Sequence, residues 1–137
     1  MKILFDTCVI IDVLQSRQPF CAEGQRLFQA VAEQKLDGFI TANSVTDIFY
    51  LTHRALHDNE KAKQILMTLF EFFAVLDTTE ADCKAALFSP VTDYEDAVMC
   101  ATAAREQMDG IVTRNTKDYS SAQGVSVFSP QELLQLL

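Results

Sequence analysis

Met1-Lys-Ile-Leu-Phe-Asp-Thr-Cys-Val-Ile-Ile-Asp12 is the stretch of sequence that decides the fold. Its apolar run Ile3–Phe5 is too short for a stable helix and is typical of a strand buried on both faces. Asp6 follows this run directly, and a new apolar segment starts at Val9. Side chains at the carboxyl ends of parallel strands face the crevice where open α/β sheets bind their ligands. The stretch therefore predicts an α/β sheet with an acid in its ligand-binding crevice.

Further short apolar runs alternate with helical patterns along the rest of the chain. Short apolar strands separated by helices form a parallel sheet that is covered on both faces. We therefore predict one domain over residues 1–137, an α/β fold of three layers (α/β/α) with a five-stranded parallel sheet. The later strands are expected at 39–41, 73–76, 111–113 and 124–128, and the helices at 9–14, 20–34, from 43 onward, 59–72, 80–87, 94–108 and from 130 onward.

Size and composition exclude several classes of protein. The 137 residues are 49% apolar and 22% charged, which suits a globular domain with its own core. No run of about 18 apolar residues and no signal peptide occur, so we expect a cytoplasmic protein without membrane contact. Four cysteines lack any Cys-x-x-Cys pair and only two histidines are present, which argues for reduced thiols and against a zinc site. The net charge of −8 argues against tight, non-specific nucleic-acid binding but does not exclude a nuclease whose acids cluster to hold cations.

Several acidic and amide side chains are expected at the edge of the sheet where the strands end. Asp6 ends the first strand. Asp47 is expected in the first turn of the helix after the second strand, and Asp96 in the first turn of the helix before the fourth. Asn115 and Asp118 follow the fourth strand. If these side chains converge, they form a site for a hard cation.

Two of these acids have an alternative role as helix caps. Ser44-x-x-Asp47 and Asp93-x-x-Asp96 each place an acid at the third helical position, where a carboxylate accepts hydrogen bonds from backbone amides. Capping does not explain Asp6, whose burial requires a cationic partner. Either a metal ion or Arg114 would provide the positive charge beside Asp6.

The remaining acids are expected on the surface. Asp12 lies inside the first helix, and a turn of about 100° per residue keeps Glu95 off the face of Asp96. A capping box is expected over residues 77–80. Helix-end or solvent-face positions are expected for Asp58, Glu60, Glu71, Glu80 and Asp82.

Four motifs together resemble a PIN domain. Their order, their spacing and the flanking apolar residues all agree, and the likeness runs as far as Val127-Phe-Ser-Pro-Gln-Glu-Leu133. Many small stand-alone members of this family are VapC-like ribonuclease toxins of bacterial toxin–antitoxin pairs. The motifs are Ile3-Leu-Phe-Asp6-Thr-Cys-Val-Ile-Ile-Asp12, Ser44-Val-Thr-Asp47-Ile-Phe-Tyr50, Tyr94-Glu-Asp96-Ala97 and Ile111-Val-Thr-Arg-Asn115-x-Lys-Asp118-Tyr119.

The resemblance implies an endoribonuclease that depends on Mg2+ or Mn2+ and hydrolyses RNA phosphodiesters. By motif, Asp6 and Asp96 would be the main metal ligands, and Asp47 a ligand or a residue that positions water. The fourth acid of the family commonly follows the Thr-Arg pair, where this chain has Asn115. Either this amide or Asp118 would complete the site.

The other polar residues of the motifs have less specific expected roles. Ser44 and Thr113 would orient the attacking water or the phosphate, or bond to the backbone as buried hydroxyls. Cys8 stands where the family usually has an Asn that braces the turn after the first acid, and a thiol is a weaker donor. The candidates for contact with the RNA backbone are Arg114, Lys117 and Arg17.

The resemblance also implies partners: a second copy of the chain in a homodimer, and an antitoxin that often inserts an Arg into the acidic pocket. Exposed aromatic residues, expected at Phe20, Tyr50 and Tyr119, would suit such a cationic partner.

Two alternative functions are weighed against the nuclease. A catalytically degenerate module that only binds protein or RNA is favoured by Asn115 and opposed by the three acids. A dehalogenase-type phosphatase or a receiver is disfavoured, because the phosphatase pattern needs an acid two residues after Asp6. Cys8 stands there, and no Gly-rich phosphate loop occurs among the four glycines.

Overall fold

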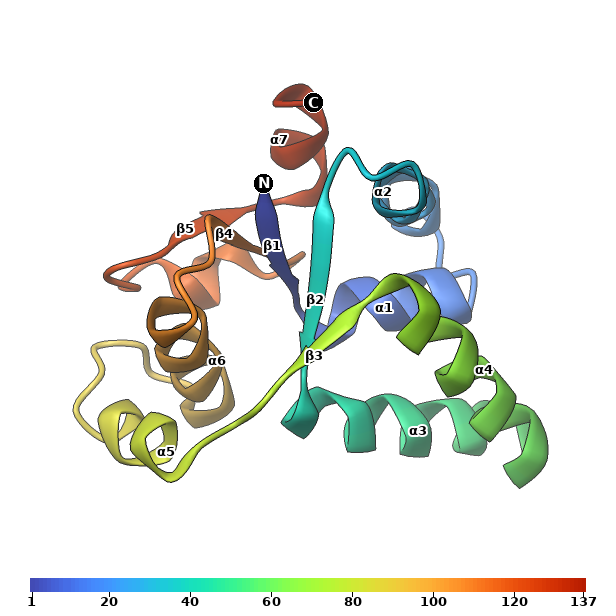
Figure 1. Ribbon diagram of the computed structural model, residues 1–137, viewed down its shortest axis with the longest axis horizontal. Helices are drawn as coiled ribbons and strands as arrows, with labels where there is room; N and C mark the ends of the chain where they lie inside the picture. The colour runs from blue at the N-terminus through green and yellow to red at the C-terminus, as the bar shows by residue number, and fades with distance from the viewer.

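The computed structural model describes residues 1–137 and contains one parallel sheet of five strands in the order β3-β2-β1-β4-β5 (Figure 1). The central strand, β1, pairs with β2 on one side and with β4 on the other. All five predicted strands are confirmed, and Asp6 follows the central one. The strands are β1 (Lys2–Phe5), β2 (Asp37–Thr41), β3 (Ala74–Leu76), β4 (Gly110–Val112) and β5 (Ser126–Phe128).

Helices cover both faces of the sheet, so the three-layer α/β/α prediction is confirmed (Figure 1). One face carries α5 (Glu80–Ala86) and α6 (Tyr94–Arg105). A short 3-10 turn, η1 (Thr116–Tyr119), was not predicted. The other face carries α1 (Thr7–Leu14), α2 (Cys21–Ala32), α3 (Ala42–Leu56), α4 (Asn59–Phe72) and α7 (Pro130–Gln135). None of these helices combines the length and the hydropathy that crossing a membrane requires.

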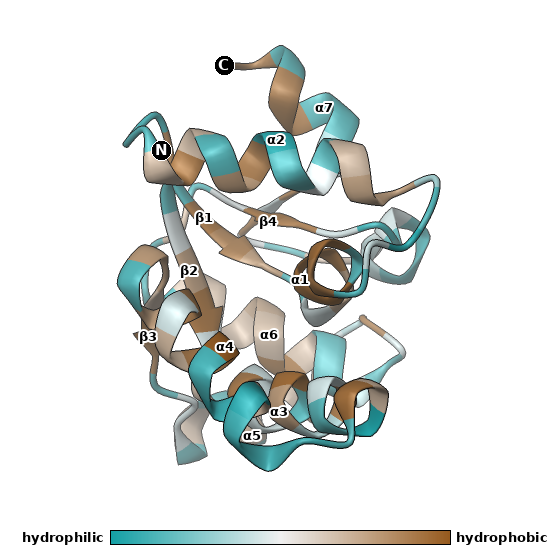
Figure 2. Ribbon diagram, turned by 90° about the vertical axis from the view of Figure 1, so that its right-hand side faces the viewer, coloured by the Kyte–Doolittle hydropathy of each residue, from teal (hydrophilic) through white to brown (hydrophobic).

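The side chains of β1 alternate between two hydrophobic cores. Ile3 and Phe5 pack on the α1 side, and Leu4 packs on the α6 side, each with no exposed surface. Phe5 contacts Phe28 and Phe73 edge to face, with ring centroids 6.3 and 5.0 Å away. Each such buried side chain contributes about 2 kcal/mol to stability. The apolar colouring of β1 and α1 in Figure 2 follows this burial on both faces.

The start of α3 differs from the sequence prediction. Its N-cap is Thr41, the last residue of β2, whose hydroxyl accepts a hydrogen bond of 3.1 Å from the backbone N–H of Ser44. The strand therefore passes into the helix without a loop. Ser44 is not the cap, and Asp47 lies in the second turn rather than the first.

The cap of α5 also differs from the prediction. The capping box is formed by Thr79 and Asp82, not by residues 77–80. Asp82 is only 2% exposed, so its expected place on the surface is wrong. Its carboxylate accepts hydrogen bonds from Arg105 at 2.9 and 3.0 Å and from Thr102 at 2.9 Å. Burial by itself would raise the pKa of this carboxyl, but hydrogen bonds from Arg105, Thr79 and Thr102 outweigh it and lower the pKa to about 2.

Asp82→Asn should destabilise the fold by about 2 kcal/mol at pH 7, measured by urea unfolding. Because the pKa of Asp82 is lower in the folded state, its contribution is complete above pH 4 or so and disappears as the pH falls towards 2. The difference between wild type and variant should shrink over that range.

Glu80→Gln is the matched control, because Glu80 lies on the same helix in an exposed ion pair with Lys84. Its effect should stay below about 0.5 kcal/mol. Equal effects of the two substitutions would contradict the assignment of Asp82 as a buried structural acid.

Candidate functional site

A cleft of about 400 Å3 lies at the carboxyl ends of β1 and β2, between α3 and the first turns of α6. Open α/β sheets bind ligands at this edge. Four acids and a single basic residue, Arg54, line the cleft. The lining residues are Asp6, Thr7, Thr41, Asn43, Ser44, Asp47, Tyr50, Leu51, Arg54, Thr78, Glu95, Asp96, Val98 and Met99.

Asp6 occupies the N-cap position of α1, yet its side chain makes no capping hydrogen bond. Its Oδ2 accepts a hydrogen bond of 2.7 Å from the hydroxyl of Thr113, which is fully buried behind it. The Cys8 thiol donates to the same oxygen at 3.6 Å. Burial raises the pKa of Cys8 to about 11, so the thiol stays a neutral donor. Thr113 therefore holds Asp6, and its hydroxyl is not free for the predicted contact with water or phosphate.

Asp96 lies in the first turn of α6, as predicted, but it does not cap the helix. Asp93 is the N-cap and accepts a hydrogen bond of 3.0 Å from the backbone N–H of Asp96. The carboxylate of Asp96 instead accepts a hydrogen bond of 3.0 Å from the hydroxyl of Tyr119. Burial raises the pKa of Asp96 to about 6, and the negative charge of Asp6 adds to the shift while the Tyr119 hydrogen bond opposes it.

Two further acids lie in the cleft. Asp47 reaches it from the second turn of α3, which removes its capping alternative. Glu95 also lines the cleft, so the expectation that it turns away is wrong: the cleft is wide enough to include both Glu95 and Asp96, which lie about 100° apart on α6. Partial burial and the negative charges of Asp47 and Asp93 raise the pKa of Glu95.

Asp12 and Arg114 form a pair away from the cleft. Asp12 is 2% exposed, so the prediction of a solvated side chain is wrong. Arg114 donates to both of its carboxylate oxygens, at 2.7 and 3.2 Å, and stacks 4.2 Å from the ring centroid of Phe20. Arg17 approaches the same carboxylate at 4.0 Å. A buried acid requires a counter-charge, and Arg114 provides it for Asp12 rather than for Asp6.

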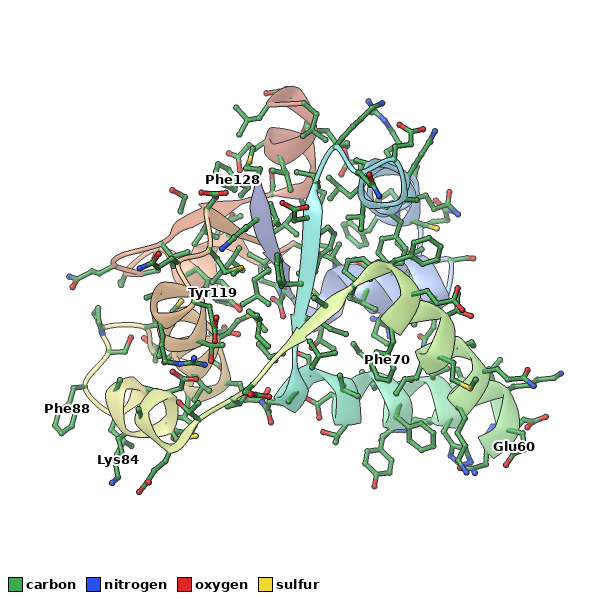
Figure 3. All side chains as sticks on the ribbon, in the orientation of Figure 1. Glu60, Phe70, Lys84, Phe88, Tyr119 and Phe128 are labelled. Atoms are coloured by element: carbon green, nitrogen blue, oxygen red, sulfur yellow. The ribbon has the colours of Figure 1, made fainter.

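The segment after β4 is arranged differently from the sequence expectation. Asn115, Lys117 and Asp118 are exposed, and none of them lines the cleft. Tyr119, expected to be exposed, is 2% exposed and donates to Asp96 (Figure 3). The available signal was that Tyr119 is the one aromatic residue within the polar run 114–121. The turn η1, which the sequence did not predict, places Tyr119 in the core beside α6.

No three His, Cys, Asp or Glu side chains are close enough to enclose a metal ion. However, oxygens of Asp6 and Asp96 lie 3.4 and 3.0 Å from one atom, the hydroxyl oxygen of Tyr119. Mg2+ in proteins often keeps several waters and is held by only one or two carboxylates. The paired carboxylates, with Asp47 and Glu95 in the same cleft, therefore fit a hydrated hard cation in both chemistry and charge.

The sequence matches the family model of the PIN domain over residues 2–117. This chain therefore belongs to the PIN domain family, as the four motifs indicated. A comparison with curated proteins gave no match.

Solved structures with a similar fold come from toxin–antitoxin complexes. VapBC2 from Rickettsia felis bound to a DNA fragment from its promoter matches with a TM-score of 0.71 and 11% identity over 94% of this chain and 98% of that one. DNA-bound VapBC from Salmonella typhimurium matches with a TM-score of 0.70 and 15% identity over 95% of this chain and 98% of that one. A toxin–antitoxin complex from Klebsiella pneumoniae matches with a TM-score of 0.68 and 21% identity over 93% of this chain and 97% of that one. At these identities the likeness concerns the fold.

Asp96→Asn should stabilise the metal-free protein, measured by thermal unfolding in EDTA. Because the pKa of Asp96 is higher in the folded state, its charge costs stability once the pH exceeds the unfolded value near 3.8, and the full cost is present above pH 6 or so. The gain from the substitution should be full at pH 8 and vanish towards pH 4. Glu60→Gln, at an exposed acid on α4, should change little. A variant less stable than wild type at pH 8 would contradict this account.

Proposed function

We propose that this protein is a metal-dependent endoribonuclease that hydrolyses RNA phosphodiesters with Mg2+ or Mn2+ and acts as the toxin of a toxin–antitoxin pair. The observation that carries this proposal is the set of four acids in one cleft at the strand ends of a PIN domain chain. Because the four like charges repel one another in a cleft that also lowers their solvation, a divalent cation is the ligand that they favour.

Each acid has a distinct role in this proposal. Asp6 and Asp96 would hold the cation, since both already approach a common point. A bound divalent cation lowers the pKa of water and neutralises charge on the phosphate. Asp47 or Glu95 would accept the proton of the attacking water, and the raised pKa of Glu95 suits this role as a general base. Ser44, which is buried at the cleft wall, remains a candidate to orient the water or phosphate.

The basic residues available to RNA differ from those expected. Arg114 is engaged by Asp12, and Arg17 lies beside the same acid. Lys117 remains exposed, although outside the cleft. Arg54 on α3 lines the cleft, makes no ion pair and is the better candidate for a phosphate contact.

The proposed partners follow from the family and from charge. The similar structures are complexes of a toxin with its antitoxin, and this chain carries a net charge of −8. We propose that a cationic antitoxin segment occupies the acidic cleft in the same cytoplasm where the RNA substrate lies. Tyr50, 67% exposed at the cleft, would contact such a segment, and a homodimer is the proposed assembly.

A degenerate module that only binds protein or RNA is the second candidate. It is favoured by Asn115 at the place of the fourth acid and by the lack of a three-ligand cluster. Metal affinity separates the two candidates, because a binding module does not need a cation in the cleft.

Cleavage of total and transfer RNA in the presence of Mn2+ or Mg2+ tests the enzyme directly. Wild type should cleave, EDTA should abolish cleavage, and Asp6→Asn or Asp96→Asn should lower the rate by at least about 100-fold. Glu60→Gln is the control at an exposed acid of α4 outside the cleft and should remain active. A folded wild type that neither cleaves RNA nor binds Mn2+ would contradict the nuclease proposal and favour the module that only binds protein or RNA.

Arg54→Ala should lower kcat/KM for the cleaved RNA about 10-fold, the effect expected when one charged hydrogen bond to a phosphate is lost. The Mn2+ affinity, measured by calorimetry, should not change. Arg26→Ala on α2 removes an exposed arginine remote from the cleft and should leave kcat/KM unchanged. Equal losses in the two variants would indicate a general charge effect rather than a contact made by Arg54.

A further inference from the structure

Tyr119 places one hydroxyl between the two acids that the proposed function assigns to the cation. Its oxygen lies 3.0 Å from Oδ1 of Asp96 and 3.4 Å from Oδ2 of Asp6. The sulfur of Met99 is 3.5 Å away. A hydroxyl has a single proton, so it donates to the nearer oxygen of Asp96 and remains in close contact with Asp6.

Each of the two carboxylates thus has one oxygen engaged by the protein and one without a partner. Oδ2 of Asp6 accepts hydrogen bonds from Thr113 and Cys8 and lies 3.4 Å from the Tyr119 hydroxyl, whereas its Oδ1 receives no hydrogen bond. Oδ1 of Asp96 receives Tyr119, and its Oδ2 receives none. Both residues are partly exposed and line the cleft. The oxygens without a partner are therefore the ones available to a ligand.

We propose that Tyr119 is a positioning residue that aligns Asp6 and Asp96 for a divalent cation. The proposal rests on the proposed function, in which the cleft binds a cation. It adds a positioning role for Tyr119, which is not one of the four acids. A hydrogen bond to a ligating carboxylate fixes its rotamer before the metal arrives, so less ordering accompanies binding. The hydroxyl also supplies this order without a further negative charge in a cleft that already holds four acids.

The alternative is that Tyr119 is a core residue whose hydroxyl merely finds an acceptor. Its ring packs with Leu4 and Ile111 in the core on the α6 side, and phenylalanine would preserve that packing. Tyr119→Phe therefore removes the hydroxyl alone. Tyr94→Phe is a matched control, because the Tyr94 hydroxyl donates to the backbone carbonyl of Cys83, outside the cleft.

Calorimetric titration with Mn2+ of the full chain tests the proposal, with urea unfolding to establish that each variant is folded. Tyr119→Phe should bind Mn2+ at least about 10-fold more weakly than wild type, as is typical when a partner of a metal ligand is removed. Tyr94→Phe should match wild type. Unchanged or tighter binding by folded Tyr119→Phe would overturn the positioning role while leaving the proposed nuclease intact. A wild type that binds no Mn2+ would overturn both.

A double-mutant cycle gives a second measurement that a purely structural role would not reproduce. In an Asp96→Asn background the hydroxyl has no charged ligand left to align, so adding Tyr119→Phe should weaken Mn2+ binding by less than about 2-fold further. A full additional 10-fold loss in the double variant would show that the hydroxyl acts independently of Asp96, and would overturn the proposal.

Discussion

A carboxylate placed directly after three fully buried strand residues, Ile3, Leu4 and Phe5, needs polar partners to offset its lost hydration, and the geometry of this protein follows from the partners of Asp6. An aspartate at the N-cap of a helix would ordinarily bond to the backbone of that helix. Asp6 instead accepts hydrogen bonds from the uncharged hydroxyl of Thr113 and thiol of Cys8, and the hydroxyl of Tyr119 lies 3.4 Å from the same oxygen. Because those donors carry no charge, the negative charge of Asp6 is oriented without being neutralised, and it stays available to a cation.

The ion pairs of the arginines also indicate that the charge of Asp6 is not neutralised within the protein. Arg114 and Arg105 pair with the two buried acids, Asp12 and Asp82, and Arg17 lies 4.0 Å from Asp12 as well. Each of these acids has two oxygens bonded to an arginine, and removing either partner would leave a poorly solvated charge. The cleft contrasts with this, since its four acids face a single exposed arginine. Charge is thus balanced at the structural acids and left unbalanced at the acids of the cleft.

The strand pattern, the order of elements and the position of the main acids follow from the sequence, because buried parallel strands leave short apolar runs whose ends share one edge of the sheet. Asp6, Asp47 and Asp96 share the cleft for that reason. Pairings over long separations leave no such pattern. The pairing of Arg114 with Asp12, 102 residues away, does not follow from local periodicity. Neither does the entry of Tyr119 into the core, which occurs in a 3-10 turn. The sequence does not predict that Glu95 lines the cleft, because periodicity separates neighbouring helix residues by about 100° but does not give the width of a cleft.

Two junctions of this fold have no loop. Asp6 is both the residue after β1 and the N-cap of α1, and Thr41 is both the last residue of β2 and the N-cap of α3. Inserting or deleting one residue at either junction would rotate the following helix by about 100°. At the second junction this would carry Asp47 out of the cleft. Evolution can therefore alter this wall of the cleft only by exchanging side chains in place, whereas the surfaces beyond the loops are free to lengthen, shorten and diverge.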